Sequence, residues 1–89
     1  MPTVTYTSAL RRFVAAPEAE VKGATLGDAL AASFAANPAL KAYVLDDQGA
    51  LRRHVAVYIN GAPAKDRARL SDTVAPRDKI YVFQALTGG

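Results

Sequence analysis

Few residues in this sequence have the types and spacing that catalysis or metal binding requires. His54 is the only histidine, and with no cysteine or paired carboxylate motif nearby it has the spacing of neither a metal site nor a catalytic triad. Asp46 and Asp47 are adjacent acids, but Gln48 and Gly49 follow them, which is typical of a turn. We therefore expect His54 to be a solvent-facing strand residue, and we expect no catalytic residue and no metal site.

The end of the chain offers another kind of chemistry. An apolar segment at 79–83 leads, without a polar linker, into residues 84–89, QALTGG. Because glycine has no Cβ atom, Gly88 and Gly89 are slim enough to enter a narrow channel and to adopt the backbone angles it imposes. When extended, residues 86–89 reach roughly 13 to 14 Å. The terminal carboxylate can thus be presented to another protein's active site, and the alternative is a frayed end without function.

Length and composition narrow the classes of function. The 89 residues are 51% hydrophobic and 21% charged, which suits one globular domain and excludes a two-domain enzyme. Without cysteine there is no disulfide framework and no thiolate chemistry. We find neither a signal-peptide pattern nor an apolar stretch of spanning length, so we expect a cytoplasmic protein without a membrane partner. The net charge of +3 is compatible with acidic partners.

Two strands and one helix are predicted in the first half of the chain. Residues 3–7 alternate threonine with apolar residues, as in a half-buried strand whose Val4 and Tyr6 face the core. Residues 19–22 alternate less clearly and predict a second strand. A helix begins after Thr25, a good N-cap, and ends at the Asn-Pro pair of residues 37–38. Its apolar stripe, which belongs against a sheet, consists of Leu26, Leu30 and Phe34.

The second half predicts a hairpin and a last strand. Residues 53–59 alternate with Val55, Val57 and Ile59 inward, and Asn60-Gly61 are the residues that a type I′ turn needs. Pro63 limits the returning segment to a short edge strand.

The remaining segments are shorter. Residues 43–45 fit a short strand or loop, and residues 70–74 fit a helical turn that buries two apolar side chains. In the last strand, 79–83, Ile80 and Val82 share one face, and Tyr81 and Phe83 share the other. We predict an α+β fold in which a mixed sheet of four to five strands packs on one main helix.

Four segments in this order resemble the MoaD/ThiS family of ubiquitin-like sulfur carriers, which have the β-grasp fold. They are the opening strand with SALRR, EVKGATLGDAL before and within the helix, VAVYING, and the ending LSDTVAPRDKIYVFQALTGG. The resemblance covers nearly the whole chain. It implies a single β-grasp sulfur-carrier domain over residues 1–89 with a flexible Gly-Gly tail at about 85–89.

The resemblance also implies a function. An E1-like activating enzyme of the MoeB/ThiF type would use ATP to adenylate the carboxylate of Gly89, and a sulfur donor would convert it to a thiocarboxylate for a sulfur-accepting synthase. Leu86, Thr87 and Gly88 would enter the partner's active site. The chain itself would be no enzyme, would bind no cofactor and would be a monomer when free.

A partner-docking surface follows from the same resemblance. Phe83 stands where family members carry an aromatic residue that packs into partner enzymes. Tyr81, Tyr58 and Ala56 would extend it into an apolar patch on the outward sheet face, unless some of these rings pack under loops. Residues 84–85, Gln-Ala, depart from the family, since many relatives carry prolines between the aromatic and the tail.

Several alternatives remain open. The sulfur would serve molybdopterin, cysteine or another sulfur metabolite, with thiazole less favoured because this chain is longer than typical thiamine-pathway carriers. A ubiquitin-like modifier joined to lysines through Gly89 is the alternative within the fold. Outside the fold, the alternative is a small module that binds nucleic acid or protein through the basic second half, though a solvated face suits these charges better. The basic residues are Arg52, Arg53, Lys65, Arg67, Arg69, Arg77 and Lys79.

Overall fold

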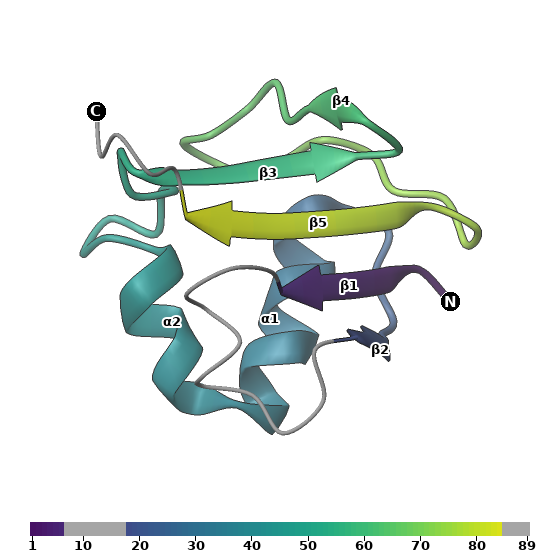
Figure 1. Ribbon diagram of the computed structural model, residues 1–89, viewed down its shortest axis with the longest axis horizontal. Coiled ribbons are helices and arrows are strands. Elements are labelled where there is room, and N and C mark those ends of the chain that lie inside the picture. Colours follow the sequence, from purple (N-terminus) through teal and green to yellow (C-terminus); the bar gives the residue numbers. More distant parts are fainter. Residues whose placement is uncertain (7–17, 85–89) are drawn as a thin grey trace.

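The chain folds around one mixed five-stranded sheet, seen in a computed structural model that describes residues 1–6 and 18–84 (Figure 1). The strands are β1 Thr3–Tyr6, β2 Glu18–Glu20, β3 Val55–Ile59, β4 Ala62–Pro63 and β5 Lys79–Gln84. Their order is β2-β1-β5-β3-β4. The central pair, β1 and β5, is parallel, and the other three pairs are antiparallel. The predicted α+β class and mixed sheet are confirmed.

Two helices cover one face of this sheet: α1 Leu26–Ala36 and α2 Pro38–Val44 (Figure 1). The predicted ends of α1 are confirmed. The Thr25 side chain accepts a 3.2 Å hydrogen bond from the backbone N–H of Asp28, and Asn37 is the C-cap. The prediction of a strand or loop at 43–45 was wrong, because Tyr43 and Val44 belong to α2. Pro38 both ends one helix and starts the next, since proline lacks only an N–H that the first turn leaves unpaired.

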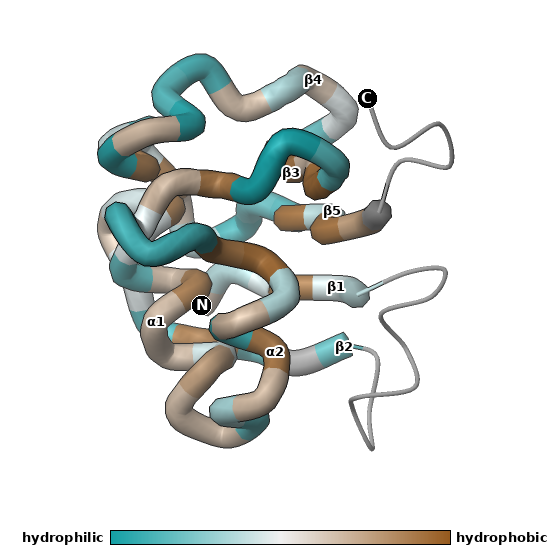
Figure 2. The backbone as a smooth tube through the Cα atoms, turned by 90° about the vertical axis from the view of Figure 1, so that its left-hand side faces the viewer, coloured by the Kyte–Doolittle hydropathy of each residue, from teal (hydrophilic) through white to brown (hydrophobic). Residues whose placement is uncertain are grey.

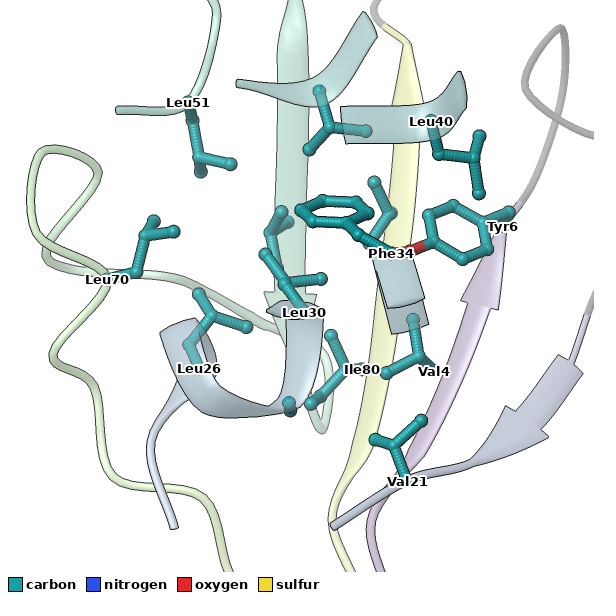
Figure 3. Packing of buried hydrophobic residues seen from close by; sticks show 14 of the residues in the cluster. Val4, Tyr6, Val21, Leu26, Leu30, Phe34, Leu40, Leu51, Leu70 and Ile80 are labelled. Carbon is teal, nitrogen blue, oxygen red and sulfur yellow. The ribbon is translucent and has the colours of Figure 1, made fainter. Parts of the chain in front are cut away.

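The core lies between the helices and the sheet (Figure 3). The predicted stripe of α1 is buried there with residues of α2 and of the central strands. Gly23 allows the close approach of α1, since a Cβ atom at this position would lie 2.6 Å from the backbone nitrogen of Ala29. The hydroxyls of Tyr6 and Ser33 share a buried 2.5 Å hydrogen bond. Within residues 1–6 and 18–84, no buried side-chain nitrogen or oxygen lacks a partner.

The predicted hairpin is present between β3 and β4. Asn60 and Gly61 have φ values of 52° and 85°, and positive φ at both central residues is the requirement of a type I′ turn. The strand begins at Val55 and not at Arg53, because Arg53 and His54 form a turn. His54 is thus a half-buried turn residue, and its placement in a strand was wrong.

The loop between β4 and β5 differs from its prediction. Residues 70–74 contain no helix, although Leu70 and Val74 are buried as expected. Two aspartates organise the backbone here instead: the Asp72 carboxylate accepts the N–H groups of Lys65 and Asp66, and Asp66 accepts those of Ala68 and Arg69. The hydrogen bonds of these aspartate side chains stabilise a non-helical backbone in place of the predicted helical turn.

Over the residues that the structure describes, no helix is long and apolar enough to cross a membrane.

Candidate functional site

The sheet face that the helices leave uncovered, called here the open face, carries the four predicted docking residues. Ala56 and Tyr58 alternate along β3 with buried Val55 and Val57, and Tyr81 and Phe83 alternate along β5 with buried Ile80 and Val82. The strand register sets Ala56 opposite Phe83 and Tyr58 opposite Tyr81. The structure therefore brings together all four, which we call the aromatic patch.

The aromatic rings of this patch support one another. Tyr58 and Phe83 stack with ring centroids 5.3 Å apart and an interplanar angle of 27°. Tyr81 is 37% exposed, and Tyr58, Phe83 and Ala56 are half-buried. The hydropathy of the chain is high along β3 and β5, which hold the patch (Figure 2). The patch is thus an ordered apolar surface in contact with solvent.

The four predicted tail residues, Leu86 to Gly89, lie outside the described residues. Their starting point is nevertheless visible, because β5 extends to Gln84 and this residue pairs with Val55 at the beginning of β3. Phe83 is therefore both a member of the aromatic patch and the second-last described residue before the tail. A segment of five extended residues beyond Gln84 reaches roughly 17 Å.

The other polar residues considered as sites have structural roles. Asp46 Oδ1 accepts the backbone N–H groups of Gln48 at 2.8 Å and Ala50 at 3.1 Å, which confirms the predicted turn. Within the described part of the chain, no group of three or more histidine, cysteine, aspartate or glutamate residues is placed to hold a metal ion.

Two arginines of the basic second half are tied to the backbone. The Arg67 guanidinium donates to the carbonyl oxygens of Arg52 and Val55, each at 2.7 Å, and Arg52 Nε donates to the carbonyl oxygen of Ala42 at 2.7 Å. These bonds fasten the segment before β3 to α2 and to the β4–β5 loop. The positive charge of these two residues thus serves the fold, which weakens the case for a nucleic-acid surface.

Two carboxyl groups near the hairpin have perturbed acidity. A hydrogen bond from the Ser71 hydroxyl, with further bonds from backbone N–H groups, lowers the pKa of Asp66. Bonds from the Ala75 N–H and the Asn60 side-chain amide lower the pKa of Asp78. Hydrogen-bond donors favour the charged form of a carboxyl group. Both groups hold loops, and neither belongs to the aromatic patch.

An apolar groove of about 560 Å³ lies on the helical side of the molecule. Among the described residues that line this groove, Lys41 is the only charged one, so they offer little with which to orient a polar ligand. The lining residues are Gly27, Ala31, Phe34, Ala35, Pro38, Lys41, Leu45 and Gly49.

Sequence reasoning missed part of the open face. Thr3 and Thr5 of β1 pair with Glu20 and Glu18 of β2. Thr5 also pairs with Tyr81 of β5, so polar residues border the aromatic patch on the side of this sheet edge. The alternation of residues 3–7 implied that the threonines face outward, but only the register shows what lies beside them.

Known proteins resemble this chain in sequence and in structure. The model of the ThiS family matches residues 4–89. Small archaeal modifier protein 1 of Haloferax volcanii is 39% identical over 66 residues, which are 74% of this chain and 71% of that protein. The crystal structure of SAMP1 from Haloferax volcanii superposes with a TM-score of 0.80 at 32% identity and covers 99% of this chain and 98% of its own.

More distant structures share the fold. The structure of the Amycolatopsis orientalis BexX/CysO complex has a chain with a TM-score of 0.85 at 24% identity, covering 100% of both chains. CysO of Mycobacterium tuberculosis has a TM-score of 0.84 at 22% identity and covers 97% of this chain and 100% of its own. The predicted ubiquitin-like β-grasp fold is thereby confirmed.

Proposed function

The chain belongs to the ThiS family of small ubiquitin-like carriers and modifiers, and on that premise we propose that it carries sulfur on the α-carboxylate of Gly89. An E1-like enzyme is the activating partner, and a sulfur-accepting synthase is the recipient. The observation that carries the proposal is the aromatic patch on β3 and β5, because β5 leads directly toward the Gly-Gly tail. A partner that holds the patch also receives the tail.

The chemistry requires activation, because a carboxylate is a poor electrophile. A carboxylate oxygen attacks the α-phosphorus of ATP, an acyl adenylate forms, and pyrophosphate leaves. A sulfur nucleophile then attacks the carbonyl carbon, and the C–O bond to AMP breaks. With sulfide as this nucleophile, loss of its remaining proton gives a thiocarboxylate, in which sulfur has replaced one oxygen of the carboxylate and is ready for transfer. The enzyme supplies ATP and catalysis, while the chain supplies the carboxylate.

The tail and the domain have separate tasks in this scheme. Gly88 and Gly89 present no side chain that would widen the tail, so the reacting carbon can pass through a narrow opening. Leu86 and Thr87 occupy the entrance of the partner's active site, and the aromatic patch keeps the folded domain bound outside it. Docking on a rigid surface lowers the entropy cost of bringing the carboxylate to the nucleotide.

The recipient of the sulfur is a synthase of molybdopterin, of cysteine or of another sulfur metabolite. The likeness to the CysO structures concerns the fold, since the identities are 24% and 22%. The cognate synthase is therefore best identified by supplying the thiocarboxylated chain to each candidate enzyme and following the loss of sulfur from Gly89.

A protein modifier is the second candidate function, and the 39% identity to small archaeal modifier protein 1 favours it. The activation of Gly89 would be the same. The nucleophile would be the ε-amine of a lysine in another protein, so that an isopeptide bond forms and AMP leaves. Isopeptide-linked conjugates in a cell lysate, lost on deletion of Gly89, would identify this role.

Intact-mass spectrometry tests the carrier function. The chain is incubated with an E1-like enzyme of the same genome, ATP and a sulfide source, and we expect a mass increase equal to the difference between one sulfur and one oxygen atom. The variant that lacks Gly89 should not gain this mass if the carboxylate must stand at the end of a full-length tail. Failure of every such E1-like enzyme to adenylate the chain would contradict the proposal.

A further inference from the structure

The open face has an acidic border beside the aromatic patch. β2 is an edge strand, and its register sets Glu18 opposite Thr5 and Glu20 opposite Thr3. Residues directly opposite each other on paired strands point to the same face. Thr3 and Thr5 alternate with buried Val4 and Tyr6, so both glutamates must point to the open face. A 3.4 Å hydrogen bond from the Thr5 hydroxyl to Glu18 Oε2 agrees with this placement.

The border lies at a defined distance from the patch. One row of side chains runs across all five strands, from Glu18 through Thr5 and Tyr81 to Tyr58 and Pro63. Neighbouring strands are about 4.8 Å apart, so Glu18 stands roughly 10 Å from Tyr81, with only the short Thr5 side chain between them. The strands β2, β1, β5 and β3 lie side by side in one sheet (Figure 1). A single partner surface that covers the aromatic rings therefore also reaches the carboxylates.

The two glutamates differ from the four aspartates that hold loops. Asp46, Asp66, Asp72 and Asp78 each accept backbone N–H groups and hold loops. Glu18 and Glu20 are exposed, and the hydrogen bond to Glu18 comes from a neighbouring threonine on the same face. Their negative charge also contrasts with the net charge of +3 of the whole chain. It is therefore available to an external cation.

Across β1, the positive charge in the row of Glu20 is distant. The next row runs from Glu20 through Thr3 to Lys79, so the lysine Cα lies roughly 10 Å from that of Glu20, on the far side of β1. Exposed charges at such a separation interact weakly in water and salt. Lys22 is nearer, because it is exposed and follows Glu20 by two residues across buried Val21. Glu18 is thus the carboxylate of the border whose row holds no basic residue.

Building on the carrier function, we infer that the activating enzyme binds the open face through a surface with an apolar centre and a basic edge, and that its arginine or lysine side chains lie against Glu18 and Glu20. The aromatic patch supplies the buried contact, and the glutamates select the orientation. An enzyme bound to the patch in the reverse orientation would place its basic side chains over Pro63 and β4. That end of the row from Glu18 to Pro63 holds no acidic residue. Since the tail leaves from β5, orientation decides whether Gly89 reaches the nucleotide.

The test compares the adenylation kinetics of matched variants at several salt concentrations. We expect the Glu18→Gln/Glu20→Gln variant to raise the KM for the carrier about five- to tenfold at low salt, with kcat unchanged, and to weaken the salt dependence of kcat/KM. Asp28→Asn is the control for a change in charge, because Asp28 is an exposed residue of α1 on the covered side of the sheet. Its KM should stay within about twofold of the original.

The outcomes separate this inference from the carrier function. An unmodified chain that is never adenylated would overturn both. An adenylated chain whose double variant keeps the original KM and salt dependence would overturn the acidic border alone, as would an equal effect of Asp28→Asn. Thermal unfolding of each variant checks the fold, and Glu18→Lys/Glu20→Lys should raise KM further than neutralisation if the partner edge is basic.

Discussion

The two faces of the sheet are built from the same strands but do different work. On the covered face, Val57, Ile80 and Val82 are no more than 2% exposed and pack against the helices. On the open face, Tyr58 and Phe83 stack on each other and Tyr81 is 37% exposed. Burial of the first set stabilises the fold, whereas the part of the second set that is still exposed is removed from water only when a partner binds. Mutations on the two faces should therefore separate stability from binding.

The largest effect is expected on the covered face. Leu30 is fully buried between α1 and the sheet, so Leu30→Ala should lower the free energy of unfolding by about 2 to 5 kcal/mol through lost burial and a cavity. Denaturation in urea, followed by circular dichroism, measures this loss. Leu30→Met nearly conserves the volume and should cost less than about 1.5 kcal/mol. Equal losses for the two variants would show that Leu30 is not tightly packed.

The open face should show the reverse behaviour. Tyr81→Thr replaces an aromatic residue with a β-branched one, and both types favour strands, so we expect it to change the free energy of unfolding by less than about 1 kcal/mol. If Tyr81 is a central docking residue, the same change should raise the KM for the carrier in adenylation about tenfold or more. Unchanged adenylation kinetics with a folded variant would remove Tyr81 from the docking surface.

The smallest effect concerns the dependence of stability on pH. The pKa values of Asp66 and Asp78 are lowered by hydrogen bonds in the folded chain, so each adds stability above the usual value of 3.8 that is lost as the pH falls below it. Burial raises the pKa of Tyr6 above 10.0, so its contribution is present below pH 10 and lost as the pH rises further.

Thermal unfolding between pH 2 and pH 11 measures both limbs. We expect Asp78→Asn to flatten the acid limb, and Tyr6→Phe to flatten the alkaline limb while it also removes the hydrogen bond to Ser33. Identical pH profiles for Asp78→Asn and the original chain would contradict a lowered pKa for Asp78. Neither variant touches the aromatic patch, so adenylation kinetics at neutral pH should change little.

Local signals predicted much of the fold. The N-cap at Thr25, the Asn60-Gly61 turn and the alternation of the strands depend on a few adjacent residues, and each was read correctly. The second helix was missed because Pro38 is compatible with both a stop and a start. The β4–β5 loop was missed because Asp66 and Asp72 act on backbone groups whose positions depend on distant contacts. The strand β2 covers Glu18–Glu20 and not the predicted range 19–22, because a weak alternation of side chains does not by itself set the ends of a strand.

The candidate site was likewise predicted from the sequence only in part. The sequence by itself determined which side chains share a face of each strand, because side chains alternate with a period of two wherever a strand forms. The resemblance to the sulfur-carrier family then indicated Tyr58, Tyr81 and Phe83 as candidate outward residues and Gly89 as the candidate reactive end. Only the tertiary structure decided which strands are neighbours. Pairing β1 with β5 joins segments far apart in the chain, and together with the pairing of β2 with β1 this register sets Glu18 and Glu20 beside the aromatic patch.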